Sequence, residues 1–127
     1  MTTRALEGLR VLVVEDEFLI AMNLEEDLRA AGCHVIGPVS DLAAAMTAAS
    51  AEKFDIALLD VNLRGEKVFA VADNLRARGI AFMLLSGYGK MDLPDRFHDA
   101  PRLAKPYDPG SLLREVERLM VRKAKAG

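Results

Sequence analysis

The chain has 127 residues, of which 51% are hydrophobic and 28% are charged, as is typical of one soluble globular domain with a single core. The formal net charge of -2 at pH 7 gives no reason to expect nucleic acid or an anionic membrane as a partner. Cys33 is the only cysteine, which excludes an intramolecular disulfide and agrees with a reducing compartment. Neither a secretory signal nor an apolar run of membrane-spanning length is present. We therefore expect one cytoplasmic, unanchored domain over residues 1–127.

Five short apolar runs predict β-strands, because they are too short for helices and most are rich in β-branched residues. The runs are Val11 to Val14, Val35 to Ile36, Ile56 to Leu59, Ile80 to Leu85, and a weaker one at Arg102 to Ala104. The first run is apolar throughout, which is typical of a strand that is covered on both faces. The runs therefore predict a parallel sheet with helices on both sides.

Between these runs, apolar residues recur with the period of an amphipathic helix. The predicted stripes are Ile20, Leu24, Leu28; Leu42, Met46, Ala49; Val68, Val71, Ala72, Leu75; and Leu112, Val116, Leu119, Met120. Ser40, Asp41 and Asp108 stand where N-caps are expected, and Gly32 and Gly79 stand where helices should end.

The stretch from Gly87 to Pro101 is broken by glycines and prolines, so it predicts only a short or loose fourth helix. The whole order predicts an α/β fold, a doubly wound (βα)5 domain with a five-stranded parallel sheet.

Polar residues follow four of the predicted strands: Glu15 and Asp16, Asp60, Ser86, and Lys105. Right-handed crossovers place the carboxyl ends of parallel strands at one edge of the sheet, so we expect these side chains to converge. Three neighbouring carboxylates repel one another unless a cation is present, and Mg²⁺ with its oxygen ligands fits best. Asp60 would then be the nucleophile that forms an aspartyl phosphate, with the metal, a hydroxyl and an ammonium group balancing the phosphoryl charge.

Taken singly, each of these residues has an ordinary structural explanation. Acids at the start of a helix interact favourably with its dipole, and an aspartate or serine after a strand is commonly a turn residue. A lysine before a proline is commonly solvated. Only their joint occurrence at one edge of one sheet favours a phosphoryl-transfer site.

The segments around these residues resemble the receiver domain of two-component response regulators. The resemblance spans essentially the whole chain and rests on Val11-Leu12-Val13-Val14-Glu15-Asp16-Glu17, Leu58-Leu59-Asp60-Val61-Asn62, Leu84-Leu85-Ser86-Gly87 and Lys105-Pro106. It implies a flavodoxin-like domain that a histidine kinase or a histidine phosphotransfer protein phosphorylates in a reaction dependent on Mg²⁺. It also implies a signalling domain rather than an enzyme, with at most slow autodephosphorylation.

The resemblance assigns a role to each matching residue. Asp16 would bind the metal directly and Glu15 through water, while Asp60 would be both a metal ligand and the phospho-acceptor. Asn62 would supply its backbone carbonyl to the metal. The other matches imply a switch hydroxyl at Ser86, a small residue at Gly87, a phosphate-pairing ammonium at Lys105, and a cis peptide bond between Lys105 and Pro106.

Two features depart from the usual family pattern. Leu63-Arg64-Gly65-Glu66 replaces the usual Met-Pro after the acceptor, and Arg102 stands at the usual aromatic switch position. Together with Ser86-Gly87-Tyr88-Gly89, they resemble a subgroup of stand-alone receivers that is often paired with kinases of the HWE or a related type. In such a chain Tyr88 is the candidate to replace the aromatic switch, and the stretch from Gly87 to Pro101 is the expected mobile output surface.

The sequence leaves other functions open. A metal-dependent phosphohydrolase could use the same acids, although no further cluster of acids or histidines supplies a second metal or a base. A third reading is a binding module that acts without phosphorylation. Because the chain stops soon after the fifth helix, we expect no output domain and an output through protein binding, whether as relay, phosphate sink or docking partner. The cognate kinase and the output partner are not specified by the sequence.

Overall fold

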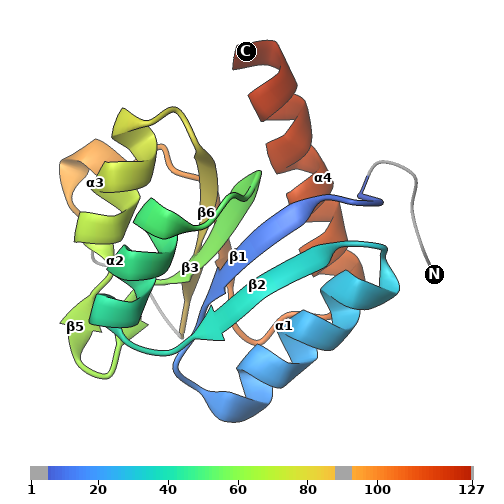
Figure 1. Cartoon of the computed structure of the whole chain (residues 1–127), viewed down its shortest axis with the longest axis horizontal. Coiled ribbons are helices and arrows are strands. Elements are labelled where there is room, and N and C mark those ends of the chain that lie inside the picture. The colour runs from blue at the N-terminus through green and yellow to red at the C-terminus, as the bar shows by residue number, and fades with distance from the viewer. Residues whose placement is uncertain (1–5, 88–92, 127) are drawn as a thin grey trace.

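The computed structural model describes residues 6–87 and 93–126, with side chains up to residue 122. Five parallel strands form one sheet in the order β2-β1-β3-β6-β7. Figure 1 shows β2, β1, β3 and β6 side by side in this sheet. The strands are β1 (Arg10–Val14), β2 (His34–Val39), β3 (Ile56–Asp60), β6 (Ala81–Ser86) and β7 (Arg102–Ala104). Without the two short strands β4 and β5, this is the flavodoxin-like order 2-1-3-4-5, so the predicted fold class is confirmed.

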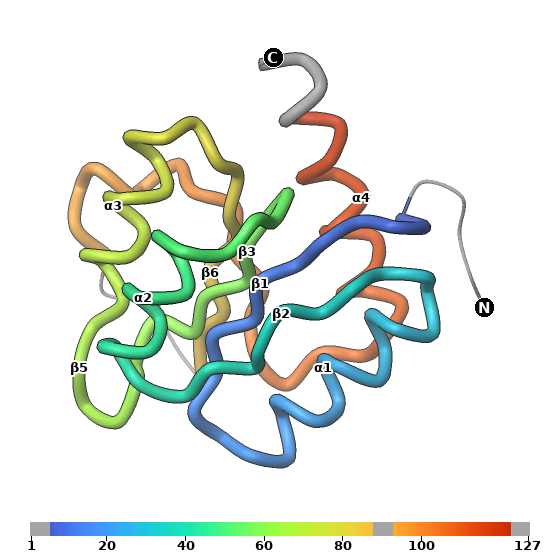
Figure 2. Tube along the Cα trace, viewed as in Figure 1, coloured from blue at the N-terminus to red at the C-terminus, as the bar shows by residue number. Residues whose placement is uncertain are grey.

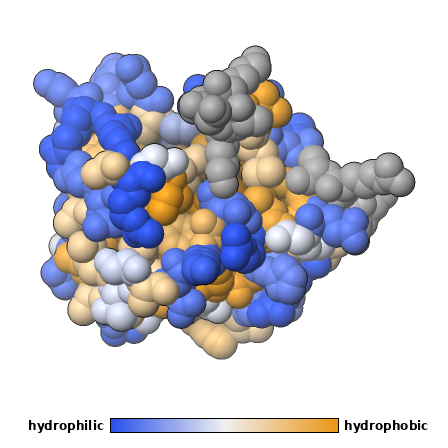
Figure 3. Space-filling model, turned by 45° about the horizontal axis from the view of Figure 1, so that its top comes forward, coloured by the Kyte–Doolittle hydropathy of each residue, from blue (hydrophilic) through white to orange (hydrophobic). Residues whose placement is uncertain are grey.

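Four α-helices are present among the described residues: α1 (Phe18–Ala30), α2 (Leu42–Ala51), α3 (Phe69–Ala77) and α4 (Pro109–Ala126). The Cα trace shows α2 beside α3 on one side of the sheet, while α1 and α4 lie on the other side (Figure 2). None of the helices in the described ranges is long and apolar enough to cross a membrane. Hydrophilic and hydrophobic residues are interspersed on the face shown in Figure 3.

Apolar side chains on the central strands point alternately to the two faces of the sheet, so a hydrophobic core forms on each face. Leu12 and Val14 of β1 pack with α2 and α3, whereas Val11 and Val13 pack with α1 and α4. Side chains of successive strand residues point to opposite faces of the sheet, so a strand apolar throughout is buried on both faces. This is why the run at Val11 to Val14 correctly predicts a covered parallel strand.

Helix ends follow the predicted capping residues. A carboxylate oxygen of Asp41 accepts a hydrogen bond of 2.7 Å from the backbone N–H of Ala44 at the start of α2. Asp108 accepts one of the same length from the N–H of Ser111 at the start of α4. Just after the C-terminal end of α1, Gly32 has a φ of 97°, a left-handed conformation that glycine adopts without strain.

A hairpin after β3 was not predicted. Strands β4 (Asn62–Leu63) and β5 (Glu66–Lys67) pair antiparallel, and they are joined by Arg64 at φ 50° and Gly65 at φ 87°. Positive φ at both loop residues is the mark of a type I′ turn, the preferred two-residue hairpin connection. The hairpin occupies the segment where the chain departs from the usual family pattern.

The fourth helix is reduced to one turn of 3₁₀-helix, η1 (Asp95–Phe97), among the described residues. Phe97 is fully buried, and its ring lies 5.4 Å from that of Phe69 and 6.0 Å from that of Phe82. The guanidinium group of Arg96 also forms two hydrogen bonds with the carboxylate of Asp73. The predicted short fourth helix is therefore confirmed for the described part of that stretch, but Phe97 anchors it more firmly than a loose segment would be; residues 88–92 lie outside the described part.

We predict that Phe97→Ala lowers the free energy of unfolding by about 3–5 kcal/mol, because it leaves a cavity between α3 and β6. Urea denaturation measures this loss. Arg96→Ala is the control, because it removes an exposed contact from the same turn and should have a much smaller effect. Equal losses of stability in the two variants would contradict the conclusion that the buried ring of Phe97 anchors the η1 segment.

Candidate functional site

The polar residues predicted to converge do lie at one edge of the sheet. Glu15 and Asp16 follow β1, Asp60 ends β3, Ser86 ends β6, and Lys105 follows β7. One carboxylate oxygen from each of the three acids lies within 4.8 Å of the others. The edge is the crevice at the carboxyl ends of β1 and β3, where the strand order reverses and where open α/β sheets bind ligands.

Lys105 supplies the cation that faces the acids. Its Nζ atom lies 2.5 Å from Oε1 of Glu15 and 3.2 Å from Oδ2 of Asp60, and all three side chains are less than 10% exposed. Burial works against the charged ammonium, but contact with Glu15 and Asp60 outweighs it and raises the pKa of Lys105. Lys105 therefore stays protonated, and the Lys105–Pro106 bond is cis, as the family resemblance implied.

Asp60 is in an environment that disfavours its ionised form. Burial, followed by the hydrogen bond and the negative charge of Glu15, raises the pKa of Asp60 to about 8, although Lys105 works in the opposite direction. One ammonium group is thus too little positive charge for this cluster. The geometry and the all-oxygen donor set fit a hard divalent cation such as Mg²⁺.

Asp16 lies on the more exposed side of the cluster. Its Oδ2 atom accepts a hydrogen bond of 2.8 Å from the backbone N–H of Arg64 in the β4–β5 turn. Partial burial opposes ionisation, but this hydrogen bond and further ones, including one with Asp60, outweigh it and lower the pKa of Asp16. Asp16 is therefore ionised at neutral pH.

The other predicted site residues occupy the same edge. Asn62 opens β4, and its backbone N–H donates a hydrogen bond of 3.2 Å to Oδ1 of Asp60. Ser86 is 9% exposed, and its backbone carbonyl accepts a hydrogen bond of 2.6 Å from the N–H of Lys105. The hydroxyl and the ammonium group are thereby carried by two adjacent, hydrogen-bonded strands.

Arg102 stands at the usual aromatic switch position, but its side chain is not buried as an aromatic side chain there would be. It is exposed, and its guanidinium group donates a hydrogen bond of 2.7 Å to the backbone carbonyl of His98, just after η1. The side chain therefore ties β7 to the η1 segment from outside. Tyr88, the candidate substitute for the aromatic switch, lies outside the described residues.

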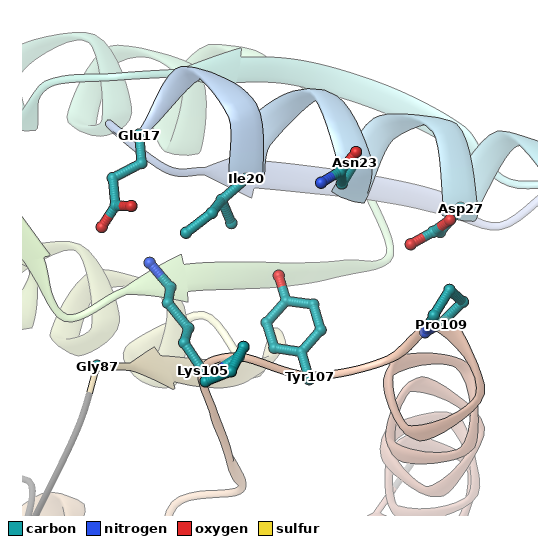
Figure 4. A pocket seen from close by; sticks show the side chains of 9 residues that line it. Glu17, Ile20, Asn23, Asp27, Gly87, Lys105, Tyr107 and Pro109 are labelled. Carbon is teal, nitrogen blue, oxygen red and sulfur yellow. The ribbon is translucent and has the colours of Figure 1, made fainter.

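A cavity of about 450 Å³ opens beside the acidic cluster, between α1 and the chain after β7, as Figure 4 shows. Its lining residues are Glu17, Ile20, Asn23, Asp27, Gly87, Lys105, Pro106, Tyr107 and Pro109. The hydroxyl of Tyr107 points toward α1, and it is buried without a hydrogen-bond partner among the described residues. Sequence reasoning missed Tyr107, because its only signal is its place directly after Lys105-Pro106.

Known proteins match both the sequence and the fold. The family model for the response regulator receiver domain matches residues 11–117. The transcriptional regulatory protein PdtaR of Mycobacterium tuberculosis is 32% identical over 112 residues, which cover 85% of this chain and 55% of PdtaR. The chain thus spans about half the length of the curated relatives it matches.

Two solved structures illustrate the similarity of fold. SdrG from Sphingomonas melonis Fr1 is 37% identical with a TM-score of 0.81, and the match covers 93% of this chain and 99% of SdrG. The receiver domain of the sensor histidine kinase PA1611 from Pseudomonas aeruginosa PAO1, solved with a magnesium ion in its active-site cleft, has a TM-score of 0.72. It is 23% identical, and the match covers 89% of this chain and 98% of that domain.

We predict that Asp60→Asn raises the free energy of unfolding of the metal-free protein, and that the gain grows with pH. A carboxyl group whose pKa is raised from 3.8 to about 8 binds a proton in the native state that the unfolded chain has already lost. Wild-type stability should therefore fall as pH rises between these values, by about 1 kcal/mol or more. Asparagine cannot ionise and does not share this fall.

Urea denaturation in the presence of a chelator, at about pH 5 and about pH 8, measures the effect. The control is Asp99→Asn, which changes an exposed aspartate after η1 and should leave the pH dependence as in wild type. A gain that is the same at both pH values would contradict a raised pKa at Asp60.

Proposed function

The chain belongs to the family of response regulator receiver domains, and we propose that Asp60 is its phospho-acceptor. The observation that carries this proposal is the position of Asp60 at the end of β3, where its carboxylate lies 3.2 Å from Nζ of Lys105 and inside the three-acid cluster. Receiver domains are phosphorylated by histidine kinases or phosphotransfer proteins. We propose the same class of donor here.

The proposed reaction transfers a phosphoryl group from a histidine of the donor. A carboxylate oxygen of Asp60 attacks phosphorus, the P–N bond to the donor imidazole breaks, and the bonding electrons leave with the imidazole nitrogen. The product is an acyl phosphate on Asp60 and a donor with an unmodified histidine. Asp60 must be ionised to attack, so the reaction requires more positive charge at the cluster than Lys105 provides.

We propose Mg²⁺ as the source of this charge, because receiver domains bind Mg²⁺ at an acidic site of this kind. When bound, the ion would neutralise charge on the carboxylates and on the transferring phosphoryl oxygens. Asp16 and Asp60 are the proposed direct ligands, with Glu15 acting through water and Asn62 through its backbone carbonyl. The magnesium ion in the PA1611 receiver domain, which shares this fold, supports the choice of metal.

Two further residues are proposed to hold the phosphoryl group itself. Lys105 would turn from its carboxylate partners to a phosphoryl oxygen, and Ser86 would donate its hydroxyl to another. Both residues would thus stabilise the negative charge on the phosphoryl oxygens during transfer.

We propose that output occurs through changed binding to a partner protein, as a relay, a phosphate sink or a docking event, in the cytoplasm. The cognate kinase is proposed to be of the HWE type, on the basis of the Ser86-Gly87-Tyr88-Gly89 segment. Since receiver domains serve signalling rather than metabolism, slow autodephosphorylation is the only hydrolysis we propose. The regulation of transcription named for PdtaR belongs to a longer protein and is not carried over.

We predict that a small phosphodonor with Mg²⁺ adds one phosphoryl group to wild type, as intact mass spectrometry detects. Asp60→Asn should remain unmodified while keeping its fold, because the only proposed nucleophile is lost. Asp99→Asn should be modified as fully as wild type. Equal labelling of wild type and Asp60→Asn would refute the assignment, and continuous donor hydrolysis without a mass change would favour a phosphohydrolase.

Metal binding should depend on the two acids after β1 to different degrees. Asp16→Asn is predicted to weaken Mg²⁺ binding about 10-fold or more, because it removes a direct ligand. Glu15→Gln should weaken it less, since Glu15 is engaged by Lys105 at 2.5 Å. Isothermal titration with Mg²⁺ measures both, and Glu26→Gln on the exposed face of α1 is the control. Unchanged affinity in Asp16→Asn would argue against its role as a ligand.

A further inference from the structure

Each of the three clustered carboxylates receives a hydrogen bond from a backbone N–H. The bonds to Glu15 and Asp60 are local, because the donors lie two residues further along, at Glu17 and Asn62, each at 3.2 Å. The bond to Asp16 is different, because its donor is 48 positions away in the sequence and is 2.8 Å distant. The orientation of Asp16 therefore depends on a separate element of the fold, the β4–β5 hairpin.

The core holds this hairpin firmly at its base. Leu63 of β4 is fully buried in the core formed with α2 and α3, and the N–H of Val68 donates a hydrogen bond of 2.9 Å to the carbonyl of Val61. Val61 is tied in turn to β6 by a bond of 3.0 Å from its N–H to the carbonyl of Leu85. The turn thus projects from a fixed base.

At the tip, the turn spans two loops at the functional edge. The N–H of Arg64 reaches Asp16, after β1, and the Arg64 guanidinium group lies 3.5 Å from the hydroxyl of Ser40, after β2. Arg64 holds a φ of 50°, which a non-glycine residue adopts at a cost. The N–H of Arg64 thus points at Asp16 from a turn in which both loop residues have positive φ.

We propose that the β4–β5 hairpin positions Asp16 for the cation, with Arg64 acting through its backbone N–H and Gly65 through its positive φ. This inference rests on the proposed Mg²⁺ site. A hydrogen bond to one carboxylate oxygen fixes the rotation of the group and leaves the other oxygen free for the metal. Without that bond, the half-exposed side chain of Asp16 can turn into solvent, and binding must then restrict it again. Groups that orient a metal ligand in this way commonly change affinity by about 10–100-fold.

Gly65→Val tests the proposal. A Cβ atom added at this position would meet no atom within 4 Å, but the φ of 87° is strained for any L side chain. The substitution should therefore act mainly by disturbing the conformation of the turn. Isothermal titration should show that the dissociation constant for Mg²⁺ rises about 10-fold. Gly65→Ala should change it in the same direction by a smaller factor, and it serves if the valine variant does not fold.

Gly79→Val is the matched control, because Gly79 also has positive φ, 72°, and open space around its Cβ position. It lies before β6, at the opposite edge of the sheet. This variant should lose stability in urea as Gly65→Val does, yet bind Mg²⁺ like wild type.

Gly65→Val should add no further loss of affinity in an Asp16→Ala background, since the hairpin acts through that carboxylate. Equal or tighter Mg²⁺ binding in Gly65→Val, compared with wild type, would overturn the proposal. So would an equal loss in Gly79→Val, because the effect would then follow stability alone. Failure of the wild-type protein to bind Mg²⁺ would instead count against the proposed function.

Discussion

Repulsion among three carboxylates at one edge of the sheet is the constraint on which the rest of this molecule depends. Two unit charges about 4 Å apart interact by roughly 4 kcal/mol at the effective dielectric of a protein surface. Glu15, Asp16 and Asp60 bring oxygens within 4.8 Å of one another. Among the described residues, Glu15 and Asp60 of this cluster form ion pairs with the ammonium group of Lys105. Burial first, and then the hydrogen bond and the negative charge of Glu15, raise the pKa of Asp60, so Lys105 leaves part of this repulsion unrelieved. This is why we propose that a divalent cation binds at the site before a phosphoryl group is transferred to it.

Most of this arrangement could be predicted from the sequence, because it follows from strand order. Once the apolar runs at Val11 and Ile56 predict covered parallel strands, the acids that follow them must share an edge. The β4–β5 hairpin could not be predicted, since its Arg64-Gly65 turn lacks the Asn-Gly or Asp-Gly signal of a type I′ loop. The anchoring of Phe97 was also missed, because aromatic rings that pack together from three different elements leave no periodic pattern in the sequence.

The hairpin shows how a departure from the family pattern can serve the same site. In this chain the segment after Asp60 folds back on itself, and the N–H of Arg64 at its tip reaches Asp16 across 48 positions of sequence. The acidic cluster is thus held from two sides, by the strands that its residues end or follow and by the β4–β5 turn that contacts Asp16. With the acids held in this way, we expect binding of the proposed metal and phosphoryl group to depend on charge more than on movement of the acids.

The same frame limits how far a signal can travel. Ser86 and Lys105 are joined by a backbone hydrogen bond between adjacent strands. A phosphoryl group that binds both side chains would therefore pull on Ser86, where β6 ends and the connection to η1 begins. The far end of that connection is held by the buried ring of Phe97. Moving a two-state equilibrium from 1:99 to 99:1 requires about 5.5 kcal/mol, whereas a hydrogen bond to a charged group contributes roughly 1.5–3 kcal/mol. Two such contacts contribute roughly 3–6 kcal/mol in total, at best about what such a shift requires, so we expect the proposed phosphorylation of Asp60 to shift a conformational equilibrium only in part. A partner protein that prefers one state would supply the remainder.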